Sequence, residues 1–299
     1  MTEVTIYLVD AFTATPGEGN RAGVVFDAGH LSVDEMQAIA AFANVSETAF
    51  LINADAADDY DLHVRYFTPS TEVPICGHAT IASHFLRSLK LNLPSGRVMA
   101  KTGAGILPVD IERTNDDVKI IMTQGKPEIG DILNEDHIDE ALSALGLLRN
   151  DLIDDLPVQF TSTGHGKVII PIKDVEKLHQ ITPDKEALKR LTKKIGHTGY
   201  FVMTIHDDGP YKTHGRMFAP AIGIDEDPVT GNGNGPAGLY MAHHGVLDFD
   251  KSTTYLGIQG EAMGKPGVIE VRVFKEKNAI SKLQVAGSAI EAGQLKYNL

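Results

Sequence analysis

Several residue types are scarce in this sequence, and each shortage excludes a class of protein. Cys76 is the one cysteine among 299 residues, so the chain cannot form an intrachain disulfide. Tryptophan is absent and aromatic residues make up only 6% of the chain, yet 42% of the residues are hydrophobic, which is typical of a globular protein. No apolar stretch approaches the roughly 20 residues that a membrane-spanning helix needs.

Basic residues are also scarce. The chain has 27 Lys and Arg against 40 Asp and Glu, which gives a formal net charge of -13. Proteins that bind nucleic acid use clustered basic residues, so neither nucleic acid nor a membrane surface is an expected partner. Residues 1–12 lack the basic start and the apolar run of a signal peptide. The expected location is therefore the cytoplasm.

The length favours two domains, and an internal repeat supports this division. An arginine–phenylalanine–proline pattern recurs 151 positions later, as Arg65, Phe67 and Pro69 and then as Arg216, Phe218 and Pro220. We predict one half-domain over residues 1–125, to which residues from about 285 to 299 can return, and a second over residues 126–284. The active-site cleft is expected between the halves.

Periodicity and capping residues predict an α+β fold in which each half surrounds a central helix with strands. Helices are expected over residues 33–44, 79–91, 182–195 and 236–244. Strands are expected over residues 4–12, 23–26, 49–52, 62–67, 98–122, 159–172, 200–205, 268–274 and 282–289.

Neither the dinucleotide-binding pattern nor the histidine pairs of this sequence lie in the surroundings that a cofactor or metal site needs. The glycine-rich segment 17–22 matches a dinucleotide fingerprint, but the apolar residues after it predict a strand, where that fingerprint needs a helix. His78 with His84, and His243 with His244, have no carboxylate or cysteine at a ligand spacing. We therefore expect neither a cofactor nor a metal.

Two glycine turns, one in each half, precede apolar helices. They are Cys76-Gly77-His78 and the segment from Thr230 to Gly235, after which Pro236 can begin a helix. Each turn is either a plain helix cap or an anion site made by backbone N–H groups at a helix N-terminus. Because the repeat supplies two equivalent turns, we favour a site for a carboxylate.

Two carboxylates lie close to these turns in the sequence. Glu47, after Ser46, is either an exposed turn residue or a general base whose pKa is raised by burial. Asp227 belongs to an acidic cluster, and Pro228 restricts its backbone so that its side chain can be aimed.

The sequence resembles the phenazine-biosynthesis PhzF-like family over essentially its full length. The matching segments are Asp10-Ala11-Phe12, Gly19-Asn20, Ser46-Glu47-Thr48, Arg65-Tyr66-Phe67-Thr68-Pro69, Gly77-His78, Arg216-Met217-Phe218-Ala219-Pro220 and Glu226-Asp227-Pro228-Val229-Thr230-Gly231. The resemblance implies the diaminopimelate-epimerase-like fold, with two pseudo-symmetric halves that each wrap a barrel-like sheet around a central helix.

The resemblance also implies roles for individual residues. Glu47 is the expected catalytic acid/base, with His78 and Asp227 as its catalytic partners. The expected substrate-binding residues are Asn20, Ser46, Cys76, Gly77, Thr230, Gly231 and Asn232. Cys76-Gly77-His78 resembles the first catalytic cysteine loop of the related epimerases, whereas Thr230 occupies the place of their second cysteine.

The expected function is that of a cofactor-independent isomerase that moves a proton on a small carboxylate-bearing substrate. Two alternatives stay open at this point: an amino-acid racemase or epimerase of the same fold, and a non-catalytic protein that binds a small molecule. A homodimer is the expected assembly because two-fold dimers are the commonest oligomers. The substrate, the stereochemistry and the pathway do not follow from the sequence.

Overall fold

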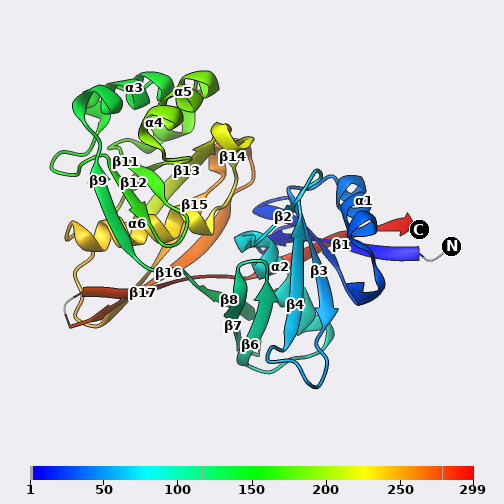
Figure 1. Ribbon diagram of the computed structural model, residues 1–299. Helices are drawn as coiled ribbons and strands as arrows, with labels where there is room; N and C mark the ends of the chain where they lie inside the picture. The colour runs from blue at the N-terminus through cyan, green and yellow to red at the C-terminus, as the bar shows by residue number, and fades with distance from the viewer. Residues whose placement is uncertain (1–2, 116, 278) are drawn as a thin grey trace. The chain divides into compact units, whose positions relative to one another are not determined.

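The computed structural model describes residues 3–115, 117–277 and 279–299. It divides into two compact units, one formed by Met1–Met122 with Ala286–Leu299 and the other by Thr123–Val285. Within these described ranges, no helix is both long enough and apolar enough to cross a membrane. Both units contain helices and runs of consecutive strands, which confirms the predicted α+β class (Figure 1).

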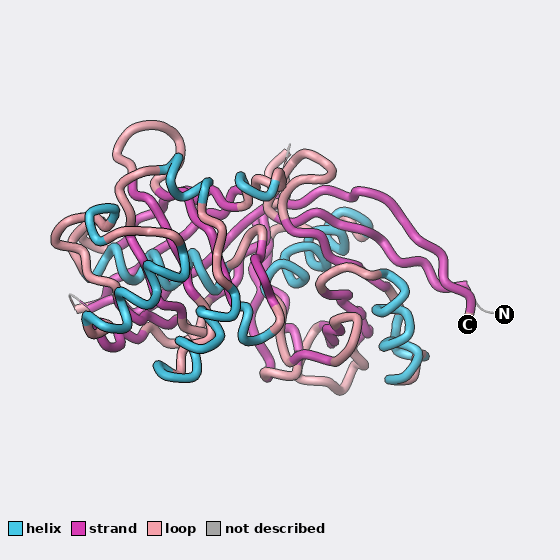
Figure 2. The backbone as a smooth tube through the Cα atoms, turned by 90° about the horizontal axis from the view of Figure 1, so that it is seen from above, coloured by secondary structure: helices cyan, strands magenta, loops and turns pink. Residues whose placement is uncertain are grey.

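The N-terminal unit is built on strands from both ends of the chain. β1 pairs with β18 in an antiparallel register from Glu3↔Asn298 to Ala11↔Ala289, and the two strands run side by side toward the termini (Figure 2). The strands are β1 (Glu3–Ala11), β2 (Asn20–Val25), β3 (Glu47–Asn53), β4 (Leu62–Phe67), β5 (Glu72–Val73), β6 (Gly96–Thr102), β7 (Gly105–Arg113), β8 (Val118–Thr123) and β18 (Ala289–Asn298).

The first long helix, α1 (Val33–Ala43), follows the short 3-10 helix η1 (Ala28–His30). The side chain of Ser32 accepts a hydrogen bond from the backbone N–H of Glu35, and the Glu35 carboxylate accepts one from the N–H of Ser32. This capping box fixes where the helix begins. The helix ends at Ala43, one residue before the predicted end, and Asn44 closes it in a left-handed conformation.

The central helix of the N-terminal unit is α2 (Gly77–Lys90). It packs against β1, β2, β3 and β18, and ten of its residues are buried. The prediction that it begins at Ala79 is wrong by two residues. Cys76 is the extended residue that precedes the helix, so Gly77 and His78 form its first turn.

The C-terminal unit repeats the order of strand pairings. β2–β3 parallel, β3–β4 antiparallel and β4–β6 parallel correspond to β11–β12 parallel, β12–β13 antiparallel and β13–β15 parallel. The strands are β9 (Glu128–Ile132), β10 (Gln159–Ser162), β11 (Lys167–Pro171), β12 (Tyr200–Ile205), β13 (Thr213–Ala219), β14 (Ile224–Asp227), β15 (Ser252–Gln259), β16 (Gly267–Glu276) and β17 (Ala279–Gly287).

Residues 159–172 form a hairpin, not the single strand that was predicted. β10 and β11 pair in an antiparallel register, and Gly164 in the turn between them has a φ of 116°. A side chain rarely adopts this backbone conformation, so glycine permits the turn. The apolar residues of β11 made residues 159–172 look continuous in the sequence, so the turn between Ser162 and Lys167 was not predicted.

The helices of the C-terminal unit are α3 (Glu135–Leu145), α4 (Val175–Gln180), α5 (Lys185–Ile195) and α6 (Gly231–His243), with the 3-10 helices η2 (Arg149–Asp151), η3 (Pro220–Ile222) and η4 (Glu261–Met263). α3, α4 and α5 contribute apolar residues to one core together with β11 and β12. The sequence had predicted α5 but neither α3 nor α4.

The central helix of this unit, α6, begins at Gly231, so the prediction that Pro236 is its first residue is wrong. Pro236 lies inside the helix, where it cannot donate a backbone hydrogen bond. Eleven of the thirteen residues of α6 are buried, and the helix packs on β10, β11 and β16. Tertiary packing thus stabilises a glycine-rich turn that propensity alone disfavours.

Candidate active site

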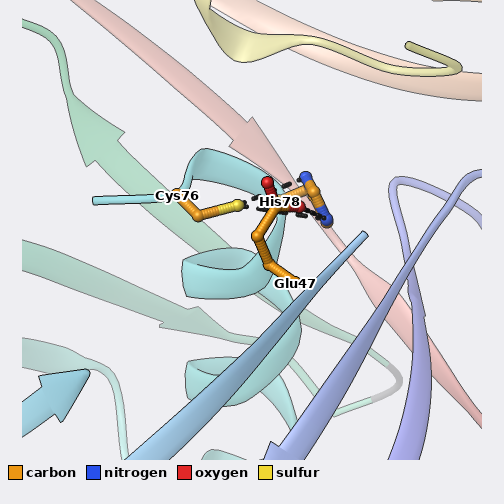
Figure 3. A group of neighbouring side chains, drawn as sticks. All are labelled: Glu47, Cys76 and His78. Carbon is orange, nitrogen blue, oxygen red and sulfur yellow. Dashed lines mark hydrogen bonds and ion pairs between the residues drawn. The ribbon is translucent and has the colours of Figure 1, made fainter. Parts of the chain in front are cut away.

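Glu47, Cys76 and His78 converge in the N-terminal unit (Figure 3). Glu47 is the first residue of β3, whereas Cys76 and His78 lie at the start of α2. The imidazole of His78 lies between the other two side chains. Its Nε2 is 3.3 Å from Oε2 of Glu47, and its Nδ1 is 3.5 Å from Sγ of Cys76. Ser46 adds a contact of 3.1 Å from its Oγ to Nε2 of His78.

The Glu47 carboxylate lies in a sheltered position. Its side chain is 17% exposed, and its Oε2 is buried without a hydrogen-bond donor among the described residues. His78 Nε2 is close enough for an ion pair but is not aligned for a hydrogen bond. A buried carboxylate oxygen without a donor retains its capacity to take a proton, as a general base requires.

The start of α2 is fixed by a buried hydroxyl pair. Thr80 donates a hydrogen bond of 2.7 Å to the carbonyl of Cys76, and the hydroxyl of Tyr66 lies 2.6 Å from Oγ1 of Thr80. Burial raises the pKa of Tyr66, so this phenol stays neutral and acts as a hydrogen-bonding group. The first N–H groups of α2, at Gly77 and His78, have no partner within the helix, as at every helix N-terminus.

Asn20 follows a tightly constrained glycine. Gly19 has a φ of 63°, and a Cβ at this position would lie 2.2 Å from the carbonyl oxygen of Ala11, so no other residue fits there. Asp10 holds the loop by accepting the backbone N–H of Gly17 at 2.7 Å and two hydrogen bonds from Arg21. Asn20 itself is 2% exposed and is the first residue of β2. As predicted, this glycine-rich segment leads into a strand.

In the C-terminal unit, Asp227 and Thr230 lie at the entry to α6. The hydroxyl of Thr230 donates a hydrogen bond to Oδ2 of Asp227. The fully buried Gln259 accepts the backbone N–H of Thr230 at 3.1 Å and donates to the carbonyl of Asp227 at 2.7 Å. Gln259 therefore fixes the backbone from β14 to α6. The sequence analysis missed it because Gln259 lies outside the motifs.

Gly231 and Asn232 form the first turn of α6, as Gly77 and His78 do in α2. Gly231 is buried, whereas Asn232 is partly exposed. Their N–H groups precede the first intrahelical hydrogen bonds, as do those of every helix N-terminus. The structure thus places Asp227, Thr230, Gly231 and Asn232 together in one unit, and Ser46, Glu47, Cys76, Gly77 and His78 together in the other.

Lys167 is a further polar residue that the sequence analysis missed. It is 6% exposed at the start of β11, and Gly199 leaves room for its side chain, because a Cβ there would lie 2.5 Å from Cδ of Lys167. Burial lowers the pKa of Lys167 to about 8, although the negative charge of Asp227 acts in the opposite direction. A single lysine beginning an apolar strand is the signal that the sequence offered.

The convergent side chains in the N-terminal unit support two kinds of chemistry. The ligand atoms of Glu47, Cys76 and His78 all lie within 4.8 Å of one another, and each belongs to a type that binds zinc. The same arrangement of a carboxylate beside an imidazole is suited to moving a proton. The spacing of Glu47, Cys76 and His78 in the sequence is compatible with zinc binding and with proton transfer.

Comparisons with known proteins agree over nearly the whole chain. A family model described as "Phenazine biosynthesis-like protein" matches residues 9–293. An isomerase of Clostridium acetobutylicum is 47% identical over 95% of both chains, and the isomerase YddE of Escherichia coli is 45% identical over 95% of both. A trans-2,3-dihydro-3-hydroxyanthranilate isomerase of Pseudomonas chlororaphis is 28% identical over 96% of both.

Solved structures identify the fold. A PhzF-family phenazine biosynthesis protein of Bacillus anthracis superimposes with a TM-score of 0.91 at 32% identity, covering 100% of both chains. A probable proline racemase of Agrobacterium radiobacter superimposes with a TM-score of 0.60 at 12% identity, over 99% of this chain and 93% of the other, and so shows the fold alone. The predicted diaminopimelate-epimerase-like fold is thereby confirmed. The chain belongs to the phenazine biosynthesis-like PhzF family and is an enzyme of the isomerase class.

Proposed function

We propose that the protein is a cofactor-independent isomerase in which Glu47 is the catalytic acid/base. The observation that carries this proposal is the buried Oε2 of Glu47, which has no hydrogen-bond donor among the described residues and lies 3.3 Å from Nε2 of His78. In the proposed reaction, Glu47 removes a proton from a carbon next to a carboxylate or a conjugated double bond. The proton returns at another carbon, so no redox change occurs.

His78 and Asp227 are the proposed catalytic partners. The contacts of the His78 imidazole with Ser46 and Cys76 hold it beside Glu47, where it can form an ion pair with the carboxylate or donate a hydrogen bond to the substrate. Asp227 is oriented by Thr230, which donates to its Oδ2. Losing any of these contacts would leave the proton-carrying groups less well oriented for transfer.

The proposed ligand is a small molecule with a carboxylate. N–H groups in the first turn of a helix have no acceptor within that helix. In the proposed reaction, those of Gly77 in α2 and Gly231 in α6 bind the carboxylate and the negative charge that develops as the proton leaves. Asn20, Ser46, Cys76, Thr230 and Asn232 complete the proposed set of binding residues. Trans-2,3-dihydro-3-hydroxyanthranilate, which a relative's name specifies, is a reasonable first candidate because it combines a carboxylate with a conjugated ring.

An amino-acid racemase is the second candidate function, and one contact favours it. Sγ of Cys76 lies 3.5 Å from Nδ1 of His78, which can take its proton and so produce a thiolate nucleophile or base. Thr230, at the corresponding place in the other unit, has no thiol. Replacing Cys76 by serine distinguishes the two functions, because only the racemase needs the sulfur.

The test is proton NMR in D2O with the purified protein and a panel of small carboxylates, including trans-2,3-dihydro-3-hydroxyanthranilate and both enantiomers of proline. We expect the wild type to produce an isomer of one of these compounds, and Glu47→Gln to produce none. Glu128→Gln, at an exposed position on β9, is the matched control and should be as active as the wild type.

Full activity of Glu47→Gln would overturn the assignment of Glu47 as the base. Exchange at the α-carbon of proline with loss in Cys76→Ser would favour the racemase. Saturable binding of a carboxylate, with no isomer and no deuterium in the recovered ligand, would identify a binding protein in place of an enzyme.

A further inference from the structure

A second cluster of ligand-type side chains lies in the C-terminal unit, and it shares no residue with the proposed catalytic set. His179 is in α4, His214 is in β13 and Glu261 begins η4, after β15. Nδ1 of His214 lies 2.7 Å from Oε2 of Glu261, and Nε2 of His179 lies 3.2 Å from the same oxygen. Two imidazoles from different elements are therefore directed at one carboxylate.

The position of His179 is fixed by Arg216. The Nη1 of this arginine donates to the carbonyls of Leu178, His179 and Ile181, at 3.0, 3.3 and 2.8 Å, and so holds the last turn of α4. Arg216 lies two residues after His214 on β13, and residues i and i+2 of a strand share a face. One strand thus presents His214 and also the side chain that positions His179.

Arg216 is itself fixed. It donates two parallel hydrogen bonds to Glu226, of 2.8 Å from Nε and 2.7 Å from Nη2, and both side chains are buried or nearly so. A bidentate pair of this kind holds the guanidinium in one orientation. Arg216 therefore holds the backbone of His179 in one position before any ion binds, as metal sites require.

The backbone that carries Glu261 is constrained as well. Gly260 has a φ of 89°, and a Cβ there would lie 2.3 Å from the carbonyl oxygen of Lys265 and 2.8 Å from that of Pro228. Only glycine fits this turn. The N–H of Gly264 donates to the carbonyl of Glu261 at 3.0 Å, which closes the short helix directly after the carboxylate.

We propose that His179, His214 and Glu261 form a binding site for a divalent transition-metal ion, with zinc the best match. Two histidines and one carboxylate are a ligand set that zinc uses, with metal–ligand distances of about 2.0 to 2.2 Å. Tetrahedral geometry at those distances places ligand atoms about 3.3 to 3.6 Å apart. The observed separations of 3.2 and 2.7 Å must lengthen by less than about 1 Å when the ion replaces the shared protons.

The site is accessible to an ion and retains an open coordination position. The side chains of His179, His214 and Glu261 are 35%, 21% and 26% exposed, so water or a small molecule can be the fourth ligand. The ring of His206 lies 5.0 Å from that of His214, and its Nε2 contacts Oγ1 of Thr204 at 2.8 Å. His206 thus borders the site without being one of its three ligands.

This proposal departs from the expectation that the histidines form no metal set. That expectation considered neighbours along the chain, whereas Glu261 lies 47 positions after His214 and 82 after His179. An ion bound to α4, β13 and η4 joins three elements of one unit. It should therefore stabilise the folded state by mass action, without any role in the proposed proton transfer.

The experiment is a Zn²⁺ titration of the full chain in competition with a chromophoric chelator. Glu47, Cys76 and His78 are also ligand types, so all proteins carry Cys76→Ser to weaken that group. We expect one zinc ion per chain, at least about tenfold weaker binding in His214→Ala and in Glu261→Gln, and unchanged binding in His243→Ala. His243 is an exposed histidine of the same unit and is the matched control.

Two further measurements keep the outcome decisive. Glu261→Gln preserves the size of the side chain, and circular dichroism checks the fold of each variant. Co²⁺ bound at the proposed site should give visible bands without the near-ultraviolet thiolate band that Cys76 would produce in the wild type. The proposal is wrong if no saturable binding occurs, or if folded His214→Ala and Glu261→Gln bind zinc as tightly as their parent. Zinc should also raise Tm in the parent but not in Glu261→Gln.

Discussion

The two units share a strand order but surround the same arginine–glutamate pair in different ways. In the N-terminal unit, Arg65 pairs with Glu72 on the surface, with side chains 21% and 41% exposed. In the C-terminal unit, the equivalent Arg216 pairs with Glu226 at 7% and 15% exposure and also donates to three carbonyls of the chain at the end of α4. The repeated arginine therefore holds the backbone together in the C-terminal unit, whereas in the N-terminal unit it forms a surface ion pair.

The polar residues near the central helices differ as well. The offset of 151 positions that relates Arg65 to Arg216 places Thr198 where the first unit has Glu47. The second unit instead has Asp227, hydrogen-bonded by Thr230, and the buried Lys167. We infer that the duplicated scaffold supplies two helix N-termini, whereas the proposed base occurs once.

Glu47→Gln should lower the turnover of a verified substrate by about a hundredfold to ten-thousandfold, the usual effect of removing a general acid/base. Asp227→Asn should have a smaller effect, because the amide can still accept the hydrogen bond from Thr230. Steady-state kinetics of both variants provide the measurement. Equal losses of turnover in the two variants would show that both carboxylates carry the proton. The inference that the base occurs in only one unit would then be wrong.

Arg216→Ala should destabilise the protein by about 3 to 5 kcal/mol, because it leaves the largely buried Glu226 and three carbonyls without their partner. Arg65→Ala should cost no more than about 1 kcal/mol, because Glu72 is exposed to water. Urea denaturation of the two variants provides the comparison. Similar losses of unfolding free energy would contradict the difference in environment that the structure shows.

The histidines of the two central helices differ in their hydrogen bonding, and one of them makes stability depend on pH. His84 in α2 is fully buried, neither ring nitrogen has a partner in the described part of the chain, and burial lowers its pKa to about 3. By contrast, His244 at the end of α6 contacts Oε1 of Gln159 at 2.7 Å. Between pH 6.5 and 3, His84 binds a proton in the unfolded chain but not in the folded chain. The free energy of unfolding therefore falls as the pH falls through this range.

The test is urea denaturation of the wild type and His84→Leu at pH 7 and pH 5. The wild type should lose about 2 kcal/mol more than the variant over this interval, because one proton of difference corresponds to about 1.4 kcal/mol per pH unit below 6.5. Identical pH dependence in the two proteins would show that His84 is not protonated selectively in the unfolded state.

Cys76→Ser and Thr230→Ser compare the residues that precede the two central helices, and they should have the smallest effects. Neither side chain caps its helix with a hydrogen bond, and in the proposed reaction neither carries the proton. We expect each variant to keep activity within about tenfold of the wild type, measured with the substrate used for Glu47→Gln. Near-complete inactivation of folded Cys76→Ser would favour a thiol-based mechanism.

Local sequence signals predicted the elements whose ends are set by local chemistry. Ser32 or Asp34 as a capping residue predicted the start of α1, because a cap needs only neighbouring residues, and the structure assigns the cap to Ser32. The alternation from Leu62 to Phe67 gave the bounds of β4. The start of α6 was predicted wrongly because Pro236 suits a first helical position. Burial of the glycines before it permits the helix to begin five residues earlier.

By itself, the sequence determined the fold class, the repeat and the motif residues around Glu47, His78 and Asp227. The fold class followed from periodicity and from the family resemblance, whereas the repeat and the motif residues followed from matching residue types along the chain. Only the tertiary structure decided that Gln259 fixes the entry to α6, that Lys167 is buried, and that His179, His214 and Glu261 meet. Contacts between residues tens of positions apart depend on how strands pair and helices pack, and no local pattern records them.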